Sequence, residues 1–463
     1  MISIKNSLIK NTIIYFIGNT LSKIISFVLL PIYTKYINPS EYGLYDITTV
    51  YINLILAVLY LDLGSTILRF MFTYDNDDKY FPISNGFFLY LISSILFAII
   101  LFSYLILKKI FTFKYFILLY FFGISSILNQ YYGFIARGLG KSKLFILTGF
   151  ISTLMNALLN ILFIVVLKKG YSYLFLSICI SNIIQILIVE IVVKCLNNIS
   201  LKYIKIRLIK EIVKFSLPLG FNMICVWFLS SFNKLVIQKY IGIYYNGIYA
   251  ISTKFGLAIS LLANSFLLAW QENAFAKKGN KEEKRKYFDS RINLVIELLG
   301  YLTALIIPIV FIIFPIFIDV QYFEAKKYVP LYLIIMIIAS FNTFLGSIFS
   351  NMFLTKKLFL STFLGALLNI VICIPLVKMY KLNGANISLL GGYLFSILMR
   401  LIYLSNELGV KVNTKKAIIA IMLSAIGYTI YLSNNIYVNI AYILAITIIL
   451  IKKKYFRYYL RSN

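Results

Sequence analysis

The sequence has 463 residues, of which 61% are hydrophobic and 13% are charged, and its formal net charge is +29. No soluble domain of this length buries so much apolar surface, so the composition excludes a water-soluble globular protein and indicates a membrane protein. The basic residues gather in the polar breaks between apolar segments. This pattern favours membrane topology over nucleic-acid binding as the source of the charge, and no nucleic-acid partner is expected.

Apolar segments long enough to cross a bilayer, about 20 residues each, recur along the whole chain. The segment 91–107 shows no regular alternation of apolar and polar residues, which argues against transmembrane β-strands. We therefore predict an all-α polytopic membrane protein with about 14 transmembrane helices. Their centres lie at roughly residues 22, 55, 94, 125, 155, 184, 226, 257, 303, 341, 368, 396, 423 and 444.

The first apolar segment is predicted to remain in the mature chain, because Asn19 and Lys23 interrupt it and no cleavage site of small residues follows. When the helices are threaded alternately through the membrane, most of the 45 Lys and Arg residues fall on the side of the N-terminus. This bias predicts cytoplasmic termini, and the composition suggests the cytoplasmic membrane of a bacterium or archaeon. The densest basic segments, 194–214 and 277–291, are predicted to face the cytoplasm and to attract anionic lipids.

Polar side chains within the apolar segments need a reason, because Lys or Arg at the bilayer centre costs about 2.5–3.5 kcal/mol. In the first segment, Asn19, Ser22, Lys23 and Ser26 follow helical spacing and share one face. We predict that this face looks into the protein and lines a lumen.

The fifth, sixth and eighth segments carry similar stripes, in which polar residues repeat at steps of four or seven. Interhelical hydrogen bonding is the alternative explanation for these stripes. The stripes consist of Ser152, Asn156 and Asn160; of Ser177, Ser181 and Gln185; and of Asn246, Thr253, Ser260, Asn264 and Gln271, with Lys254 beside the last stripe.

Together these residues predict a lumen whose cations attract an anionic substrate and whose amides and hydroxyls solvate sugar. The substrate-binding candidates are Lys23, Lys254, Lys234, Arg69, Asn19, Ser26, Asn156, Thr253 and Asn264.

Other roles remain open for the charged residues. Lys23 and Lys254 can instead pair with a carboxylate or snorkel to an interface, and the carboxylates can instead bind a coupling ion. Carboxylate candidates are Asp46, Glu190 and Glu297. Snorkelling is cheapest for basic residues near predicted helix ends, namely Arg69, Arg137, Lys234 and Arg400.

A motif from the first two segments recurs in the seventh and eighth. An even number of predicted spans separates the copies, so the repeat is parallel. It predicts two six-helix bundles, 1–198 and 199–410, followed by helices 13 and 14 and a basic tail in 411–463. The matched residues are Lys35, Tyr36, Ile37, Gly43 and Tyr45 with Lys239, Tyr240, Ile241, Gly247 and Tyr249; Ser26 with Ser230; and Thr49 with Thr253.

Several kinds of chemistry are not predicted. The sequence has no histidine, and its four cysteines are not closely paired, so neither a metal site nor a disulfide framework is expected. No phosphate-binding loop of the GxxxxGKS type is present, which argues against ATP hydrolysis and a nucleotide cofactor. The acidic run 75–78 is interpreted as a solvated turn. The short external loops argue against a membrane-embedded enzyme that acts on lipid-linked glycans.

The stretch 21–46, LSKIISFVLLPIYTKYINPSEYGLYD, resembles the opening of the oligosaccharide flippase family, the Wzx-type polysaccharide biosynthesis proteins of the MOP superfamily. The resemblance extends to about residue 410. One departure is Asn233–Lys234, where many relatives have an acidic residue before the basic one, which puts an ion-coupling role at position 233 in doubt. Further matches are Leu68-Arg69-Phe70, RGLGK from Arg137, SLPLGFN from Ser216, NGIYAISTKF from Asn246, LAWQENAF from Leu268 and LNGA from Leu382.

The resemblance implies a flippase that moves an undecaprenyl-diphosphate-linked oligosaccharide, the unit of O-antigen, capsule or exopolysaccharide, to the external leaflet by alternating access. Proton or sodium coupling and partnership with a polysaccharide polymerase and chain-length proteins are compatible with it. The first alternative is a multidrug or organic-cation exporter of the same superfamily, which needs an acidic lumen. The second is a lipid-linked glycan enzyme.

Overall fold

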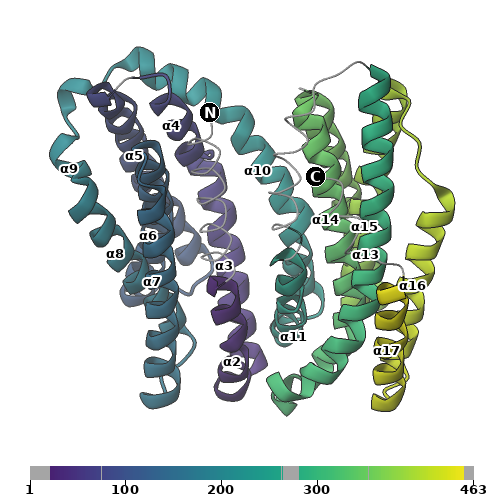
Figure 1. The fold of residues 1–463 in the computed structure, drawn as a ribbon. Coiled ribbons are helices and arrows are strands. Elements are labelled where there is room, and N and C mark those ends of the chain that lie inside the picture. The colour runs from purple at the N-terminus through teal and green to yellow at the C-terminus, as the bar shows by residue number, and fades with distance from the viewer. Residues whose placement is uncertain (1–20, 75, 262, 264–280, 353, 453–463) are drawn as a thin grey trace. The chain divides into compact units, whose positions relative to one another are not determined.

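The computed structural model describes residues 21–74, 76–261, 263, 281–352 and 354–452. The regular secondary structure of these residues is entirely helical, which confirms the predicted all-α fold (Figure 1). In this described part, nine helices are long and apolar enough to cross a membrane, and α17 (Ile436–Lys452) is a shorter apolar helix. The chain is thus a multi-pass membrane protein.

The described residues divide into two compact units. Unit 1 takes in residues up to 37 and residues 44–227, whereas unit 2 takes in residues 38–43 and everything from 228 onward. The boundary falls inside α10 (Ile206–Tyr240), so the first part of this helix belongs to unit 1 and the last part to unit 2. The division into 1–198, 199–410 and 411–463 stays a prediction.

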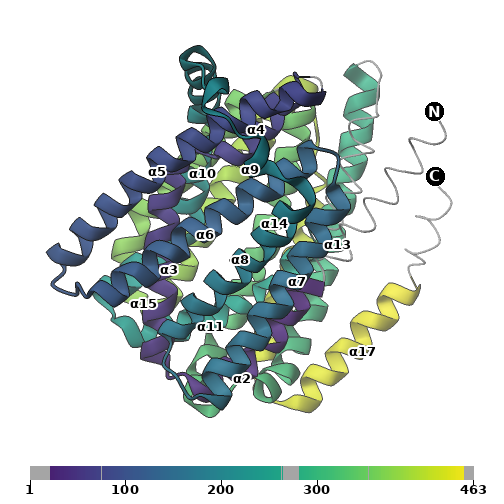
Figure 2. The same ribbon diagram turned by 90° about the vertical axis from the view of Figure 1, so that its left-hand side faces the viewer.

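Unit 1 packs its long helices against one another, with α6 and α7 both in contact with α8 and with α5 beside α6 (Figure 2). Three short helical turns, η1 (Asn76–Lys79), the π-type η2 (Ile161–Val166) and η3 (Leu201–Tyr203), lie among them. The longer helices are α2 (Leu30–Tyr36), α3 (Pro39–Tyr60), α4 (Leu63–Met71), α5 (Tyr80–Leu107), α6 (Phe113–Gly138), α7 (Ser142–Asn160) and α8 (Ser172–Val193), followed by the short α9 (Cys195–Asn198).

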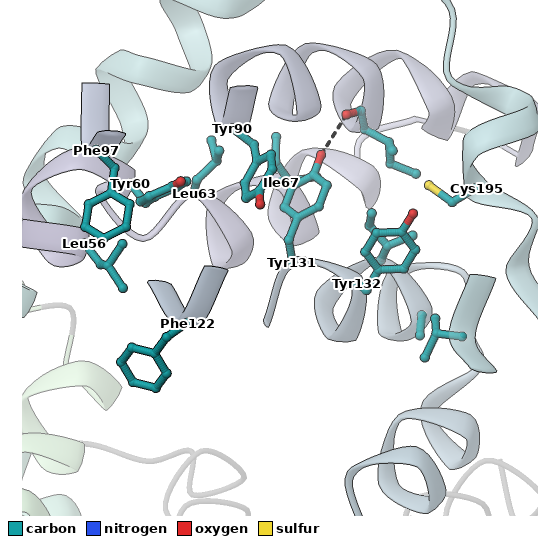
Figure 3. Close-up of a cluster of buried hydrophobic side chains, with 14 of the residues drawn as sticks. Leu56, Tyr60, Leu63, Ile67, Tyr90, Phe97, Phe122, Tyr131, Tyr132 and Cys195 are labelled. Carbon is teal, nitrogen blue, oxygen red and sulfur yellow. Dashed lines mark hydrogen bonds between the residues drawn. The ribbon is translucent and has the colours of Figure 1, made fainter. Parts of the chain in front are cut away.

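The hydrophobic core of unit 1 includes the buried tyrosines Tyr60, Tyr90, Tyr131 and Tyr132 (Figure 3). The rings of Tyr90 and Tyr131 are stacked, with centroids 6.4 Å apart. The Tyr60 hydroxyl shares a hydrogen bond of 2.8 Å with Ser94, and the Tyr131 hydroxyl donates to the Ile83 carbonyl at 2.7 Å. Each of these buried hydroxyls therefore has a partner, which offsets the cost of removing it from water.

Unit 2 contains the remaining helices of the described chain. Its 3-10 segment η4 (Val320–Lys327) connects two of the long helices. The helices are α11 (Ile243–Lys254), α13 (Lys281–Phe317), α14 (Val329–Asn351), α15 (Thr355–Leu408), α16 (Thr414–Leu432) and α17.

The 54-residue α15 consists of two membrane spans. A straight helix of that length would extend about 80 Å, far more than the roughly 30 Å hydrocarbon core. Lys381 interrupts the helix with φ 51° and ψ −130°. The two arms then lie against each other, because a Cβ atom on Gly365 would be only 2.7 Å from the Gly392 carbonyl oxygen. These arms match the predicted segments centred near residues 368 and 396.

The C-terminal helices α16 and α17 pack on α13. Gly300 permits this approach, since a Cβ atom there would lie 2.7 Å from the Ala420 Cβ. Polar contacts hold both ends of α16. The Lys416 ammonium is 2.8 Å from the Glu297 carboxylate at one end, and the Lys326 ammonium donates to the Asn434 side chain at 2.8 Å at the other.

Candidate functional site

The middle of the first copy of the repeated motif meets the second copy in unit 2. Segment 38–43 packs on the beginning of α11, where the two repeated glycines face each other. A Cβ atom on Gly43 would lie 2.9 Å from the Gly247 nitrogen, and one on Gly247 would lie 3.1 Å from the Gly43 nitrogen. The Asn246 side chain donates to the Gly43 carbonyl at 3.2 Å. Close backbone approach therefore requires glycine at both positions.

The basic residues of the repeat also have the same local geometry in both copies. The Lys35 ammonium lies 5.8 Å from the centre of the Tyr36 ring, and the Lys239 ammonium lies 5.5 Å from the centre of the Tyr240 ring. Each pair is a cation–π contact at the end of a helix, α2 in the first copy and α10 in the second. The two copies of the sequence motif thus also share the same local arrangement of a lysine and a tyrosine side chain.

A buried amide network joins α10 to both arms of α15 in unit 2. The Asn233 side-chain amide donates to the Ala385 carbonyl at 2.5 Å and to the Ser388 hydroxyl at 2.8 Å. Its oxygen accepts from the Asn369 amide at 2.8 Å. Asn233 is 1% exposed. The residue that departs from the family pattern therefore acts as a neutral interhelical connector.

A second amide network lies in unit 1 between α6 and α8. The Asn129 amide donates to the side-chain oxygens of Asn182 and Gln185, both at 3.0 Å. The Asn182 amide in turn faces the hydroxyls of Ser125 and Ser126, each at 3.4 Å. For Gln185, these bonds support the interhelical alternative to a lumen role, whereas the Ser177 and Ser181 hydroxyls donate to carbonyls of their own helix.

Asn156 and Asn160 connect α7 with α2. The Asn160 amide donates to the Tyr33 hydroxyl at 2.9 Å and approaches the Asn156 side-chain oxygen at 3.4 Å. Asn160 is buried, whereas Asn156 is half-buried. Asn156 thus remains partly accessible while its oxygen has an internal partner.

Arg400 corrects the expectation that this residue snorkels. Its side chain is 4% exposed and lies between α14 and the two arms of α15. The guanidinium donates to the Ser361 hydroxyl at 3.0 Å, to the Thr362 hydroxyl at 2.9 Å and to the Asn342 carbonyl. All three acceptors are uncharged, so the positive charge is solvated by hydroxyl and carbonyl groups. The sequence could not predict this site, because α14 and the two arms of α15 come together only in the folded chain.

The predicted lumen cations occupy different environments. Lys23, Lys234 and Lys254 are half-buried, and Lys254 is the last residue of α11. Arg69 is exposed and lies over the Phe215 ring, with 5.0 Å between the guanidinium carbon and the ring centre. These residues belong to both units, so their joint role in one lumen stays a prediction.

The predicted polar lining is only partly described. Ser26 is exposed and donates to the Ser22 carbonyl at 3.0 Å, and the half-buried Thr253 donates to the Ala250 carbonyl at 2.8 Å. Both hydroxyls therefore bond within their own helices. Asn19 and Asn264 lie outside the described residues.

Glu190 and Glu297, two of the candidate carboxylates, form contacts that hold helical segments in place. Glu190 accepts from the backbone nitrogens of Cys195 at 3.1 Å and Leu196 at 2.9 Å, which caps the beginning of α9. Burial, with Glu190 nearby, raises the pKa of the Cys195 thiol to about 12. Glu297 pairs with Lys416, and Asp46 is half-buried early in α3.

The Glu297–Lys416 pair gives a first prediction. Glu297→Gln should lower the free energy of unfolding by only about 0.5–1 kcal/mol, because Lys416 is partly exposed and solvent screens the pair. Transport should persist, because the pair has a structural role, which is to hold α16 on α13, and takes no part in moving the substrate. Chemical denaturation and a transport assay on the same variant provide the measurement. Loss of transport without loss of stability would instead assign Glu297 to ion coupling.

An apolar groove lies beside this pair in unit 2. It has a volume of about 630 Å³ and is formed by α13, α14, the second arm of α15, and α16. Leu299, Ile338, Phe341 and Leu394 are among its walls. Such a groove within membrane-spanning helices is suited to a hydrocarbon chain.

The sequence matches one family model, described as polysaccharide biosynthesis protein, over residues 8–270. A comparison with curated protein sequences finds no match.

Several solved membrane transporters have a similar fold. The structure of the lipid II flippase MurJ in an inward closed conformation gives a TM-score of 0.70 at 16% identity, covering 95% of this chain and 99% of that one. An inward-facing multidrug resistance MATE family transporter gives 0.64 at 15%, covering 82% and 93%. A MOP superfamily transporter from Pyrococcus furiosus gives 0.52 at 15%, covering 91% and 96%.

Proposed function

The chain belongs to the polysaccharide biosynthesis protein family, and from this membership we propose that it is a transporter of the MOP superfamily that flips an undecaprenyl-diphosphate-linked oligosaccharide from the cytoplasmic to the external leaflet. The observation that carries the proposal is the family match over residues 8–270, which takes in both copies of the repeated motif. The shared fold with a flippase of another lipid-linked substrate supports it.

The substrate sets physical requirements for its path. A diphosphate carries negative charge into a hydrocarbon core about 30 Å thick, so it needs cations and polar groups along the way. We assign these roles to Lys23 and Lys254, with Lys234 and Arg69 as further cations. Asn19, Ser26, Asn156, Thr253 and Asn264 are assigned to the glycan. Two parallel repeats favour alternating access as the transport mechanism.

The isoprenoid tail has different requirements, because hydrocarbon is stabilised by apolar surroundings. The groove of about 630 Å³ in unit 2 offers such surroundings and is formed by membrane-spanning helices. Its walls include Ile334, Leu390 and Ile421. We assign part of the tail to this groove, while the rest remains in lipid.

The membrane potential supplies a driving force for the proposed direction. An inside-negative potential favours outward movement of negative charge by roughly 2.3 kcal/mol per charge per 100 mV. Coupling to protons or sodium through Asp46, Glu190 or Glu297 would add to this force. At Glu190 a coupling ion would have to replace the contacts of the helix cap, and at Glu297 it would have to replace the ion pair with Lys416.

A double substitution tests the lumen assignment. Replacing Lys23 and Lys254 together with Gln should abolish complementation of surface glycan synthesis in a deletion strain, since both central cations for the diphosphate are removed. Membrane abundance should stay normal. The matched control replaces Lys108 and Lys169, both exposed, with Gln. Full glycan display by the double lumen variant would refute the assignment of these two lysines.

A further inference from the structure

The connection between α8 and α10 in unit 1 presents apolar side chains on its surface. Leu201 is 82% exposed, Ile206 is 68% exposed and Leu196 is 52% exposed. Exposed lysines alternate with them, among them Lys202 and Lys205. Apolar groups beside basic groups are typical of a segment at the membrane–water interface, where the apolar groups enter lipid and the basic groups reach headgroups.

A buried side chain fixes this connection to the beginning of α5. Asn85 is 0% exposed. Its amide donates to the Tyr203 carbonyl at 2.8 Å, and its oxygen accepts from the Lys205 nitrogen at 2.9 Å. The Ser200 nitrogen donates to the Ser84 hydroxyl at 3.3 Å. These bonds hold the backbone on both sides of residue 204, so the positions from which the neighbouring side chains extend are set before any ligand arrives.

A pocket of about 510 Å³ lies beside the fixed backbone. Aromatic rings form one wall: Tyr74 and Phe81 are stacked with centroids 6.4 Å apart. The Lys205 ammonium is 4.8 Å from the centre of the Phe81 ring. Leu208 adds an apolar side chain to the same pocket. The pocket therefore combines an apolar wall with a cation that lies over an aromatic ring.

Four charged side chains balance one another around this pocket. Lys205 and Arg207 carry positive charge, and Asp78 and Glu211 carry negative charge. Arg207 and Glu211 are 3.4 Å apart, in an exposed pair that contributes little to stability and is free to exchange partners. A headgroup with only negative charge meets repulsion from both carboxylates, whereas a headgroup with a phosphate and an amine satisfies both signs.

We propose that this pocket binds the headgroup of an amine-bearing phospholipid on the face of the membrane that the charge distribution predicts to be cytoplasmic. Lys205 and Arg207 hold the phosphate, and Asp78 and Glu211 accept hydrogen bonds from the ammonium group. The acyl chains extend past Leu201 and Ile206 into the leaflet. The lipid thereby joins the connection between α8 and α10 to the membrane surface.

Lipid competition with the purified full-length protein tests this site. The protein is placed in nanodiscs of phosphatidylethanolamine, phosphatidylglycerol or phosphatidylcholine, and native mass spectrometry counts the lipids that survive delipidation. Phosphatidylethanolamine should be retained roughly tenfold better than either of the others, the difference expected from charge-assisted hydrogen bonds to a primary ammonium. Equal or better retention of phosphatidylglycerol would overturn the proposal.

Two variants assign the effect to the pocket. Asp78→Asn combined with Glu211→Gln should remove the preference for phosphatidylethanolamine and increase retention of phosphatidylglycerol, because the repulsive carboxylates are gone. Lys202→Ala is the matched control, since this exposed lysine of the same connection lies outside the pocket lining. An unchanged lipid preference in the double variant, or the same change in Lys202→Ala, contradicts the assignment.

Discussion

Gly247→Ala is expected to lower the free energy of unfolding by about 2–3 kcal/mol and to abolish complementation, because the added methyl group meets backbone. The Cβ atom would overlap the Pro39 carbonyl and lie close to the Gly43 nitrogen. Backbone atoms cannot rotate away as a flexible side chain can, so segment 38–43 must leave its place on α11. Gly43→Ala should have a similar effect, since its Cβ would meet the Ile243 carbonyl.

Gly170→Ala is the matched control for this prediction. No atom lies within 4 Å of a Cβ atom at Gly170, and its backbone φ is not in the left-handed region. This variant should unfold at the same denaturant concentration as the wild-type protein. If Gly247→Ala matched Gly170→Ala in both stability and complementation, the close contact between the repeated glycines would be needed neither for folding nor for transport.

Arg400→Lys is expected to destabilise unit 2 more than Arg400→Met, although lysine preserves the charge. From the second arm of α15 the guanidinium reaches three acceptors, two on the first arm and one on α14, and a lysine ammonium lacks the planar fork that does this. A buried charge with too few partners should cost about 3 kcal/mol. Methionine removes the charge, and the Ser361 and Thr362 hydroxyls keep their bonds to the Leu358 carbonyl. Its cost should be about 1 kcal/mol.

Denaturant unfolding of the two variants in the same detergent measures this order. Arg207→Lys is the control for an exposed arginine, because its side chain is 92% exposed, and it should leave stability unchanged. A lysine at position 400 that is as stable as arginine would show that the fork geometry is not needed there.

Hydropathy predicted the helices well because each span must satisfy its own backbone hydrogen bonds in lipid. The predicted segments near residues 368 and 396 correspond to the two arms of α15, and those near 423 and 444 to α16 and α17. The matched glycines of the repeat also had a structural basis, since Gly43 and Gly247 meet. For these helices and for the repeated glycines, the local sequence pattern was sufficient to predict the structural feature.

The spacing of polar residues in the sequence was less informative about which of them line a lumen and which of them bond to a neighbouring helix. Asn246 belongs to a stripe for which the sequence leaves both a lumen role and interhelical hydrogen bonding open, and it is fully buried and donates to the Gly43 backbone. The partners of Asn233 and Arg400 come from helices far away in the chain. A stripe of amides has the same spacing whether it solvates a substrate or bonds to a neighbouring helix, so only tertiary contacts separate the two roles.

The most direct test of flipping is to delete the gene in its host and to measure surface polysaccharide together with undecaprenyl-diphosphate-linked glycan on the cytoplasmic face. The proposed function predicts loss of the surface polymer and accumulation of the lipid-linked unit, both reversed by the wild-type gene. Intact polysaccharide with new sensitivity to cationic drugs would contradict it and would identify the protein as an exporter.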